Sequence, residues 1–211
     1  MCKIGLVLKD NIYAKENQRL WIRCWNFANG KNNKITDVKG VLVGHSTIKT
    51  EKYNTGCTVV IPPPNNVFKE KLIAASFVHN EYGKTMGTIQ IDELGILETP
   101  IALTNTLNVG LVADALVEYT VDHCKKDGVS VRSINTVVGE CNDSALNTII
   151  DRPVKKERVF EAFHQASVDF EEGNVGAGTG TRCYGFKGGI GSASRIIELD
   201  EKIIHSSAEF L

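Results

Sequence analysis

A glycine-rich segment near the end of the chain constrains its fold more than any other feature. Residues 174–195 read NVGAGTGTRCYGFKGGIGSASR, with seven glycines in 22 positions and few side chains that build a hydrophobic core. Backbone that lacks Cβ atoms can lie unusually close to another backbone or to an anion. The segment therefore predicts one of two things. It is either a phosphate-binding loop, or strands that pass close to each other and to a substrate, with N–H groups free to meet a carbonyl or an oxyanion.

Nucleotide-binding motifs match this segment poorly. A Walker loop needs a glycine five residues before its Gly-Lys-Ser/Thr, and the one Gly-Lys-Thr, at 83–85, has Val78 at that position. A Rossmann fingerprint joins an early strand to a helix, whereas this segment follows a helical pattern late in the chain. Close packing beside a substrate is therefore favoured, with Lys187 either as a cation near the site or as a solvated loop lysine.

Composition narrows the classes of partner. The chain has 211 residues, 42% of them hydrophobic, which favours one large domain. Its 24 basic and 25 acidic side chains give no basic field, so no nucleic-acid partner is predicted. No apolar run approaches the roughly 20 residues of a membrane span, and charge follows the first residues too soon for a signal peptide. We expect a cytoplasmic protein that does not bind membranes.

Cysteines and histidines give no metal signature. The histidines form no HxH or HExxH pair, and no CxxC pair occurs, so we expect reduced thiols, no metal and no cofactor. The six cysteines are Cys2, Cys24, Cys57, Cys124, Cys141 and Cys183.

Apolar periodicity predicts a mixture of strands and helices, α/β or α+β, without an internal repeat or a domain linker. The first 33 residues show no sustained period and form an atypical N-terminal segment. Strand patterns occupy 39–48, 55–64, 88–95, the first part of 99–128, 135–141 and 196–199. Helical patterns occupy 68–83, the rest of 99–128 and part of 151–170.

Polar residues follow two of these strands. Glu140 and Asp143 are candidates to bind a substrate ammonium, and Asn142 to bind a carbonyl; the alternative is a capped loop in which Asp143 accepts backbone N–H groups. Asn105 and Asn108 either reach a substrate or cap the following helix.

Arg195 has a structural interpretation. It stands at the start of the strand IIEL, where we expect it to pair with a carboxylate.

Five segments together resemble one family. In order and spacing they are similar to the L-aminopeptidase D-esterase/D-amidases and β-peptidyl aminopeptidases of the DmpA/BapA type, from about residue 34 to 196. The segments are ITDVKGVLVGHSTI, TGCTVVIPP, IDELGILETPIALTNTLNVGLVADALVEY, VVGECNDSALN and EEGNVGAGTGTRCYGFKGGIGSASR.

The resemblance implies a layered αββα sandwich like that of N-terminal nucleophile hydrolases, with a different connectivity. Such enzymes cut themselves into an α and a β chain, and the serine that begins the β chain is the nucleophile. They assemble as homotetramers of α/β pairs and release amino-terminal residues from short peptides, amides or esters without a metal. On this basis residues 34–211 are the α-chain portion of a single aminopeptidase domain.

The resemblance also assigns site residues. It implies that Glu140 contacts the substrate's amino group and that Asn142 and Asp143 shape the pocket. Asn105 and Asn108 are expected to line or support the site. The glycine loop is expected to do the same through Lys187, Gly188, Gly189, Gly191 and Ser192.

The catalytic serine is the main departure from the family pattern. In the family, an oxyanion-hole strand and then the β chain follow the segment like GGIGSASR, so the nucleophile is expected beyond Leu211 and the sandwich is expected to be incomplete. Gly191-Ser192 matches the internal glycine loop rather than the processing site, and cleavage at Ser206 or Ser207 leaves only a few residues. Two functions follow: the substrate-binding half of an aminopeptidase that needs a β chain, or an inactive family member serving as a binding or assembly subunit.

Overall fold

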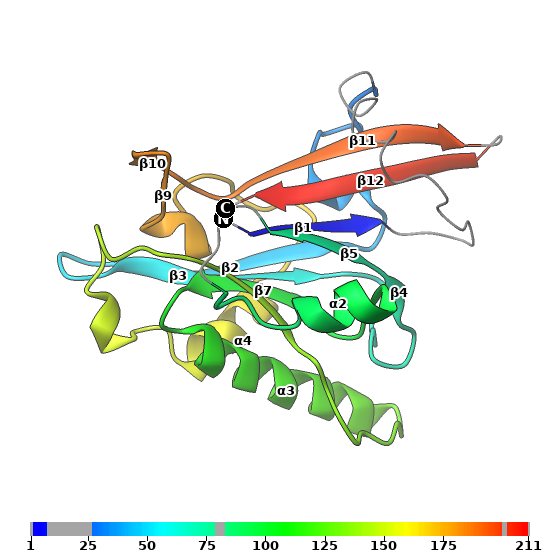
Figure 1. Ribbon diagram of the computed structural model, residues 1–211, viewed down its shortest axis with the longest axis horizontal. Coiled ribbons are helices and arrows are strands. Elements are labelled where there is room, and N and C mark those ends of the chain that lie inside the picture. Colours follow the sequence, from blue (N-terminus) through cyan, green and yellow to red (C-terminus); the bar gives the residue numbers. More distant parts are fainter. Residues whose placement is uncertain (1, 8–26, 79–82, 200–201, 211) are drawn as a thin grey trace.

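In the part of the chain that the structure describes, two four-stranded sheets lie face to face, and helices cover the outer face of one of them (Figure 1). The computed structural model describes residues 2–7, 27–78, 83–199 and 202–210. Three α-helices occur in these ranges: α2 (Thr88–Leu94), α3 (Val109–Lys126) and α4 (Lys156–His164). Short 3-10 turns are η2 (Ile35–Asp37), η3 (Ile149–Asp151) and η4 (Gly176–Thr179).

The helix-covered sheet has the order β2-β3-β7-β8. Its strands are β2 (Leu42–Lys49), β3 (Asn54–Ile61), β7 (Ile101–Asn105) and β8 (Val137–Cys141). Neighbours are antiparallel except β7 and β8, which are parallel and joined through α3. The strands predicted around 39–48, 55–64 and 135–141 and the strand-then-helix of 99–128 are therefore confirmed.

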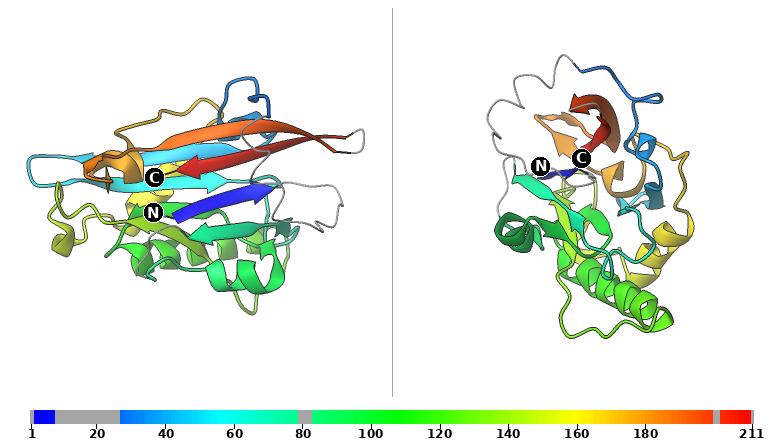
Figure 2. Two further views of the ribbon diagram at one scale, coloured as in Figure 1. Left: turned by 45° about the horizontal axis from the view of Figure 1, so that its top comes forward. Right: turned by 90° about the vertical axis from the view of Figure 1, so that its right-hand side faces the viewer.

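The second sheet joins the two ends of the chain. Its order is β11-β12-β1-β5, and all its pairings are antiparallel. The strands are β1 (Cys2–Val7), β5 (Ala75–Val78), β11 (Gly191–Leu199) and β12 (Lys202–Phe210). The labelled termini consequently lie side by side in both figures (Figure 2). Part of the atypical segment 1–33 is thus a strand of the sandwich, while residues 8–26 fall outside the described ranges.

The helix-covered sheet β2-β3-β7-β8 is the central layer, and we call it the central sheet. Two apolar clusters hold the layers together, one on each of its faces. Along β3, Cys57 and Val59 pack with Leu116 of α3 and Val159 of α4, because alternate side chains point to the helical face. Val60 points to the opposite cluster, between the sheets. Burying both faces makes the central sheet a near-continuous apolar layer, which fits its β-branched sequence.

Two of the predicted secondary-structure elements were wrong. The helix predicted at 68–83 is instead β4 (Leu72–Ile73) and β5, with residues 79–82 outside the described ranges. These residues alternate between more and less buried positions at the edge of a sheet. Phe77 is exposed there, but as an apolar residue it fits a helical spacing in the sequence. β4 pairs with β6 (Ile96–Leu97).

The strand predicted at 88–95 is helix α2. Its alternating isoleucines misled the prediction, because Ile91 is buried whereas Ile89 is 84% exposed. Gly87 and Gly95 flank the helix at φ 87° and 66°, a left-handed backbone that glycine adopts without strain.

Among the described residues Arg195 has no carboxylate partner of the kind that the sequence predicted. Its Nη1 donates to the amide oxygen of Asn33 and to the carbonyl of Ser194, both at 2.7 Å. The carboxylate of Asp37 accepts instead from the Ser194 hydroxyl at 2.6 Å, so that acid is already engaged by the neighbouring side chain.

Candidate functional site

The carboxyl ends of β7 and β8 gather the polar candidates at one edge of the central sheet. The parallel register places Thr104 beside Glu140 and Asn105 beside Cys141. The β9–β10 hairpin, formed by β9 (Arg182–Cys183) and β10 (Phe186–Lys187), lies at the same end of the sandwich (Figure 1). Residues distant in sequence therefore meet where two parallel strands end, a common position for sites in α/β folds.

Glu140 is a buried carboxylate without a cationic partner in the described part of the chain. It is 8% exposed and lies on the same face of the sheet as Val138, which packs in the helix-side cluster. The Thr106 hydroxyl donates a hydrogen bond to its Oε2. None of the ion pairs within the described residues includes Glu140. A buried carboxylate of this kind is suited to receive a cationic group from outside.

Asp143 belongs to a buried polar network. The carboxyl is 1% exposed, and its Oδ1 accepts a hydrogen bond of 3.0 Å from Asn147 Nδ2. Burial raises its pKa, although hydrogen-bonding groups of Thr55, Asn147 and Asn105 oppose the rise. Asn105 Nδ2 in turn donates to Thr55 Oγ1 at 2.9 Å. The network links the loop after β8 to the start of β3 and the end of β7.

Buried acceptors in this network are incompletely satisfied. Within the described ranges, Asp143 Oδ2 and Asn147 Oδ1 have no hydrogen-bond partner of good geometry. The carbonyl of Asp143 accepts from the N–H groups of Leu146 and Asn147. In the capped-loop alternative the Asp143 side chain accepts backbone N–H groups; here its carbonyl closes the turn, while the side chain accepts from the Asn147 amide.

Asn142 is exposed and stabilises its own loop. Its Oδ1 accepts from the backbone N–H of Ser144 at 2.9 Å, the geometry of an Asx turn. The two asparagines near α3 also have internal partners. Asn105 Oδ1 accepts the Asn108 N–H at 3.2 Å, and Asn108 Nδ2 donates to the carbonyl of Val154 at 2.7 Å. Asn105 thus closes the turn before α3, whereas Asn108 is the N-cap residue of that helix and its side chain makes no capping hydrogen bond.

The glycine-rich segment packs directly on the central sheet. In η4, the N–H of Gly176 donates to Thr47 Oγ1 at 2.8 Å and that of Ala177 to Thr58 Oγ1 at 3.1 Å. A Cβ atom added to Gly180 would lie 2.0 Å from the carbonyl oxygen of Asn54 and 3.0 Å from Asp143 Cβ. The glycines are therefore needed because this backbone lies against β3 and beside Asp143.

Lys187 holds the glycine loop together. Its Nζ donates to the carbonyls of Gly178 at 2.8 Å and Gly188 at 2.6 Å. Partial burial, and then the charge of Lys49, lower the pKa of Lys187. Gly188 also donates its N–H to the carbonyl of Thr181 at 2.9 Å.

The remaining predicted loop residues contact other elements. A Cβ atom on Gly189 would lie 2.6 Å from the carbonyl oxygen of Gly173, and one on Gly191 would meet no atom within 4 Å. The Ser192 hydroxyl donates to Glu172 Oε1 at 2.9 Å and accepts the Ile35 N–H at 3.2 Å. These residues contact residues 172–173 and η2 rather than Glu140.

Three residues at this site were not predicted from the sequence. Thr106 and Asn147 stand near predicted candidates in sequence, one beside Asn105 and the other four residues after Asp143. Thr55 joins the site only through strand pairing, and no local pattern in the sequence indicates that contact.

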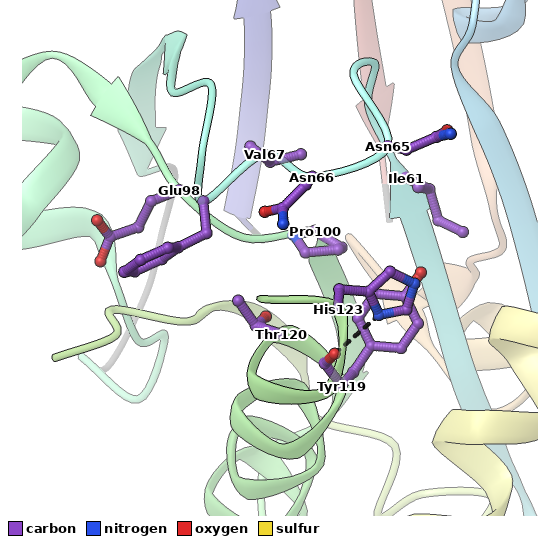
Figure 3. Close-up of a pocket in the computed structure, with 10 residues that line it drawn as sticks. Ile61, Asn65, Asn66, Val67, Glu98, Pro100, Tyr119, Thr120 and His123 are labelled. Carbon is purple, nitrogen blue, oxygen red and sulfur yellow. Dashed lines mark hydrogen bonds between the residues drawn. The ribbon is translucent and has the colours of Figure 1, made fainter. Parts of the chain in front are cut away.

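A separate small pocket lies between α3 and the segment after β3 (Figure 3). His123 Nδ1 donates there to the carbonyl of Tyr119 at 2.9 Å, and Asn66 Nδ2 to Asp127 at 2.8 Å. It shares no lining residue with the candidate set, so we place the site at the ends of β7 and β8 instead.

Over the described ranges, no group of three or more His, Cys, Asp or Glu side chains is arranged to hold a metal ion. Within those same residues, the helices are too short or too polar to cross a membrane.

Comparisons with known proteins agree with the resemblance seen in the sequence. The model of Peptidase family S58 matches residues 33–207. A β-peptidyl aminopeptidase, BapA of Sphingosinicella microcystinivorans, is 39% identical over 183 residues, which are 82% of this chain and 45% of that protein.

Solved structures with similar folds include two from other organisms. The PH0078 protein from Pyrococcus horikoshii OT3 superposes with a TM-score of 0.80 at 49% identity, over 87% of this chain and 54% of that one. The L-aminopeptidase D-Ala-esterase/amidase of Ochrobactrum anthropi gives a TM-score of 0.77 at 32% identity, over 87% and 53%. The latter is described as a prototype serine aminopeptidase with a variant of the Ntn hydrolase fold. The chain spans about half the length of these relatives.

Proposed function

Because the chain belongs to Peptidase family S58, we propose that it supplies the amine-binding half of an aminopeptidase-type hydrolase. Its substrates are short peptides, amino-acid amides or esters with a free amino group. The proposal extends to a β chain that carries the nucleophilic serine, to a homo-oligomer of such pairs, and to a cytoplasmic location.

The main support for the proposal is that the Glu140 carboxylate is buried without a cationic partner among the described residues. Its carboxylate is buried at the end of β8, receives one hydroxyl from Thr106, and has no lysine or arginine partner among the described residues. Desolvated carboxylates are costly unless a charge-assisted hydrogen bond compensates them. A substrate ammonium supplies both the charge and the donors, and fixing it positions the adjacent scissile carbonyl.

The surrounding residues hold this carboxylate in place. Thr106 orients Oε2, and the network of Asp143, Thr55 and Asn105 fixes the loop that follows Glu140. Hydrolysis itself needs an activated serine and oxyanion donors, and we assign no residue of this chain to either role.

The direct test is ligand binding to the purified chain. Isothermal titration with L-alaninamide and β-alaninamide should show that Glu140→Gln weakens binding by about tenfold or more, the usual value of a hydrogen bond to a charged group. Glu157→Gln is the matched control, because Glu157 is an exposed carboxylate of α4. Equal affinity of Glu140→Gln and the wild type would refute the assignment.

Hydrolysis separates the proposal from its alternative. Aminoacyl p-nitroanilides should be cleaved when a β chain is supplied, and mass spectrometry of the same sample reports self-cleavage. Amine binding without hydrolysis in the presence of the β chain would instead support an inactive binding or assembly subunit.

A further inference from the structure

Three cationic side chains lie together beside the candidate site. Arg182 and Lys187 are directly opposite each other in the β9–β10 register. Lys49, the last residue of β2, pairs with Asn54, whose carbonyl oxygen lies against Gly180, two residues before Arg182. All three residues are exposed, and we call them the basic cluster.

The basic cluster has no acidic partner in the described part of the chain. None of the ion pairs found there includes any of its members. Backbone carbonyls are the partners instead: Lys187 donates to Gly178 and Gly188, and Arg182 Nη2 to Gly185 at 3.4 Å.

Other lysines of the same protein do have acidic partners. Lys156 pairs with Asp114 at 2.5 Å, and Lys52 with Asp151 at 2.5 Å. Like charges directly opposite on neighbouring strands destabilise a hairpin. A hairpin that keeps Arg182 opposite Lys187, with Lys49 beside them, is one that an anion would stabilise.

The basic cluster adjoins the residue after Glu140. Cys141 Sγ lies 3.9 Å from the carbonyl oxygen of Arg182, so the end of β8 contacts β9. The strand that carries Glu140 and the hairpin that carries Arg182 and Lys187 therefore lie at the same end of the sandwich (Figure 1).

We propose that Lys49, Arg182 and Lys187 form a carboxylate-binding site for short peptides whose amino group lies at Glu140. The amine end of this inference rests on the proposed function, whereas the anion end rests on the basic cluster alone. Peptides with a free terminal carboxylate are accordingly preferred over their amides. A bound carboxylate would also offset the repulsion from Lys49 that helps to lower the pKa of Lys187.

A matched pair of ligands tests the site. L-alanyl-L-alanine and L-alanyl-L-alaninamide differ only in the carboxylate, and isothermal titration should show the acid binding about three- to tenfold more tightly to the wild type. Arg182→Gln and Lys187→Gln should each reduce that preference, and added salt should weaken it. Lys39→Gln, a change at an exposed lysine after η2, should retain it.

Two variants keep the test independent of folding. Lys187→Gln disturbs the bonds to Gly178 and Gly188, whereas Arg182→Gln leaves them intact, and thermal unfolding checks both variants. The inference is overturned when the wild type binds acid and amide equally, or when the preference survives in both variants.

Acetate separates this inference from the proposed function. Sodium acetate alone, titrated against the chain and followed by NMR, should shift the side-chain signals of Arg182 and Lys187. Acetate binding without any binding of the amide at Glu140 would support the carboxylate site and contradict the proposed function. Amide binding at Glu140 without a response to acetate would support the proposed function and contradict the carboxylate site.

Discussion

The hydroxyl of Thr106 donates a hydrogen bond to Oε2 of Glu140 across the ends of two parallel strands. Thr106 lies just beyond β7, in the turn that leads into α3, while Glu140 lies near the end of β8. One hydrogen bond thus ties a buried carboxylate to the start of the long helix, which makes the position of Glu140 dependent on the packing of α3.

Thr106→Val tests how much this bond contributes. Valine preserves the shape of threonine but removes the donor, leaving Glu140 Oε2 without a partner, so the free energy of unfolding should fall by about 1–3 kcal/mol. Urea unfolding measures the difference.

Thr106→Ser is the control for that variant. Serine keeps the hydroxyl and should recover most of the stability, because only a methyl group is lost. A Thr106→Val protein as stable as the wild type would mean that Glu140 is held by other groups.

The strand-helix-strand unit from β7 to β8 was readable from sequence for a physical reason. Its strands are buried on both faces, so their apolar residues form continuous runs. Its helix is long, so its apolar residues repeat with the helical period. The polar residues at the strand ends follow directly from that unit. By contrast, β5 and α2 bury few apolar side chains, and their patterns therefore predicted the opposite structures.

Long-range contacts at the site were beyond sequence reasoning. The contact of Gly180 with Asn54 and the bond from Asn105 to Thr55 depend on how distant segments pair. Nothing in the local composition of 174–195 tells which of its glycines face a neighbouring backbone. The prediction of close packing was general, and only the fold assigns it to β3 and to Asp143.

Asp143→Asn should change how stability depends on pH. Burial raises the pKa of Asp143 above 3.8, so the folded protein keeps a proton that the unfolded chain has already lost. The contribution of Asp143 is therefore greatest at low pH and is lost as the pH rises through the pKa of the folded state. The unfolding free energy of the wild type minus that of Asp143→Asn should decrease as the pH rises above about 4.

Asparagine suits this comparison because its Oδ1 can still accept the hydrogen bond from Asn147. Urea unfolding at several pH values gives the difference directly. A difference that is constant, or that grows with pH, would show that the carboxyl is not destabilised by burial.

Cys57 should resist thiol reagents in the folded protein. It is fully buried in β3, and burial raises the pKa of its thiol to about 12, so almost no reactive thiolate is present at neutral pH. Cys183 is partly exposed on the β9–β10 hairpin. Peptide mapping after reaction with Ellman's reagent should find Cys57 labelled at least about tenfold more slowly than Cys183.

Labelling in guanidinium chloride is the control, because unfolding should bring the two rates together. Rapid labelling of Cys57 under native conditions would mean that β3 opens locally and that the central sheet is less stable than its packing indicates.

Gly180→Ala should be strongly destabilising because the added methyl group meets backbone that cannot rotate away. Its Cβ would lie 2.0 Å from the carbonyl oxygen of Asn54, so either η4 or β3 must move. We expect a loss of about 1–3 kcal/mol or more in urea unfolding, together with weaker amine binding, because Asp143 lies beside the same glycine. Gly110→Ala provides the matched control: it lies in α3 with no atom within 4 Å of an added Cβ, and alanine there should be neutral or stabilise by up to about 1 kcal/mol. Equal stability of the two alanine variants would show that the glycine-rich segment does not pack on β3 in solution, and the link from that segment to the loop after Glu140 would then have to be abandoned.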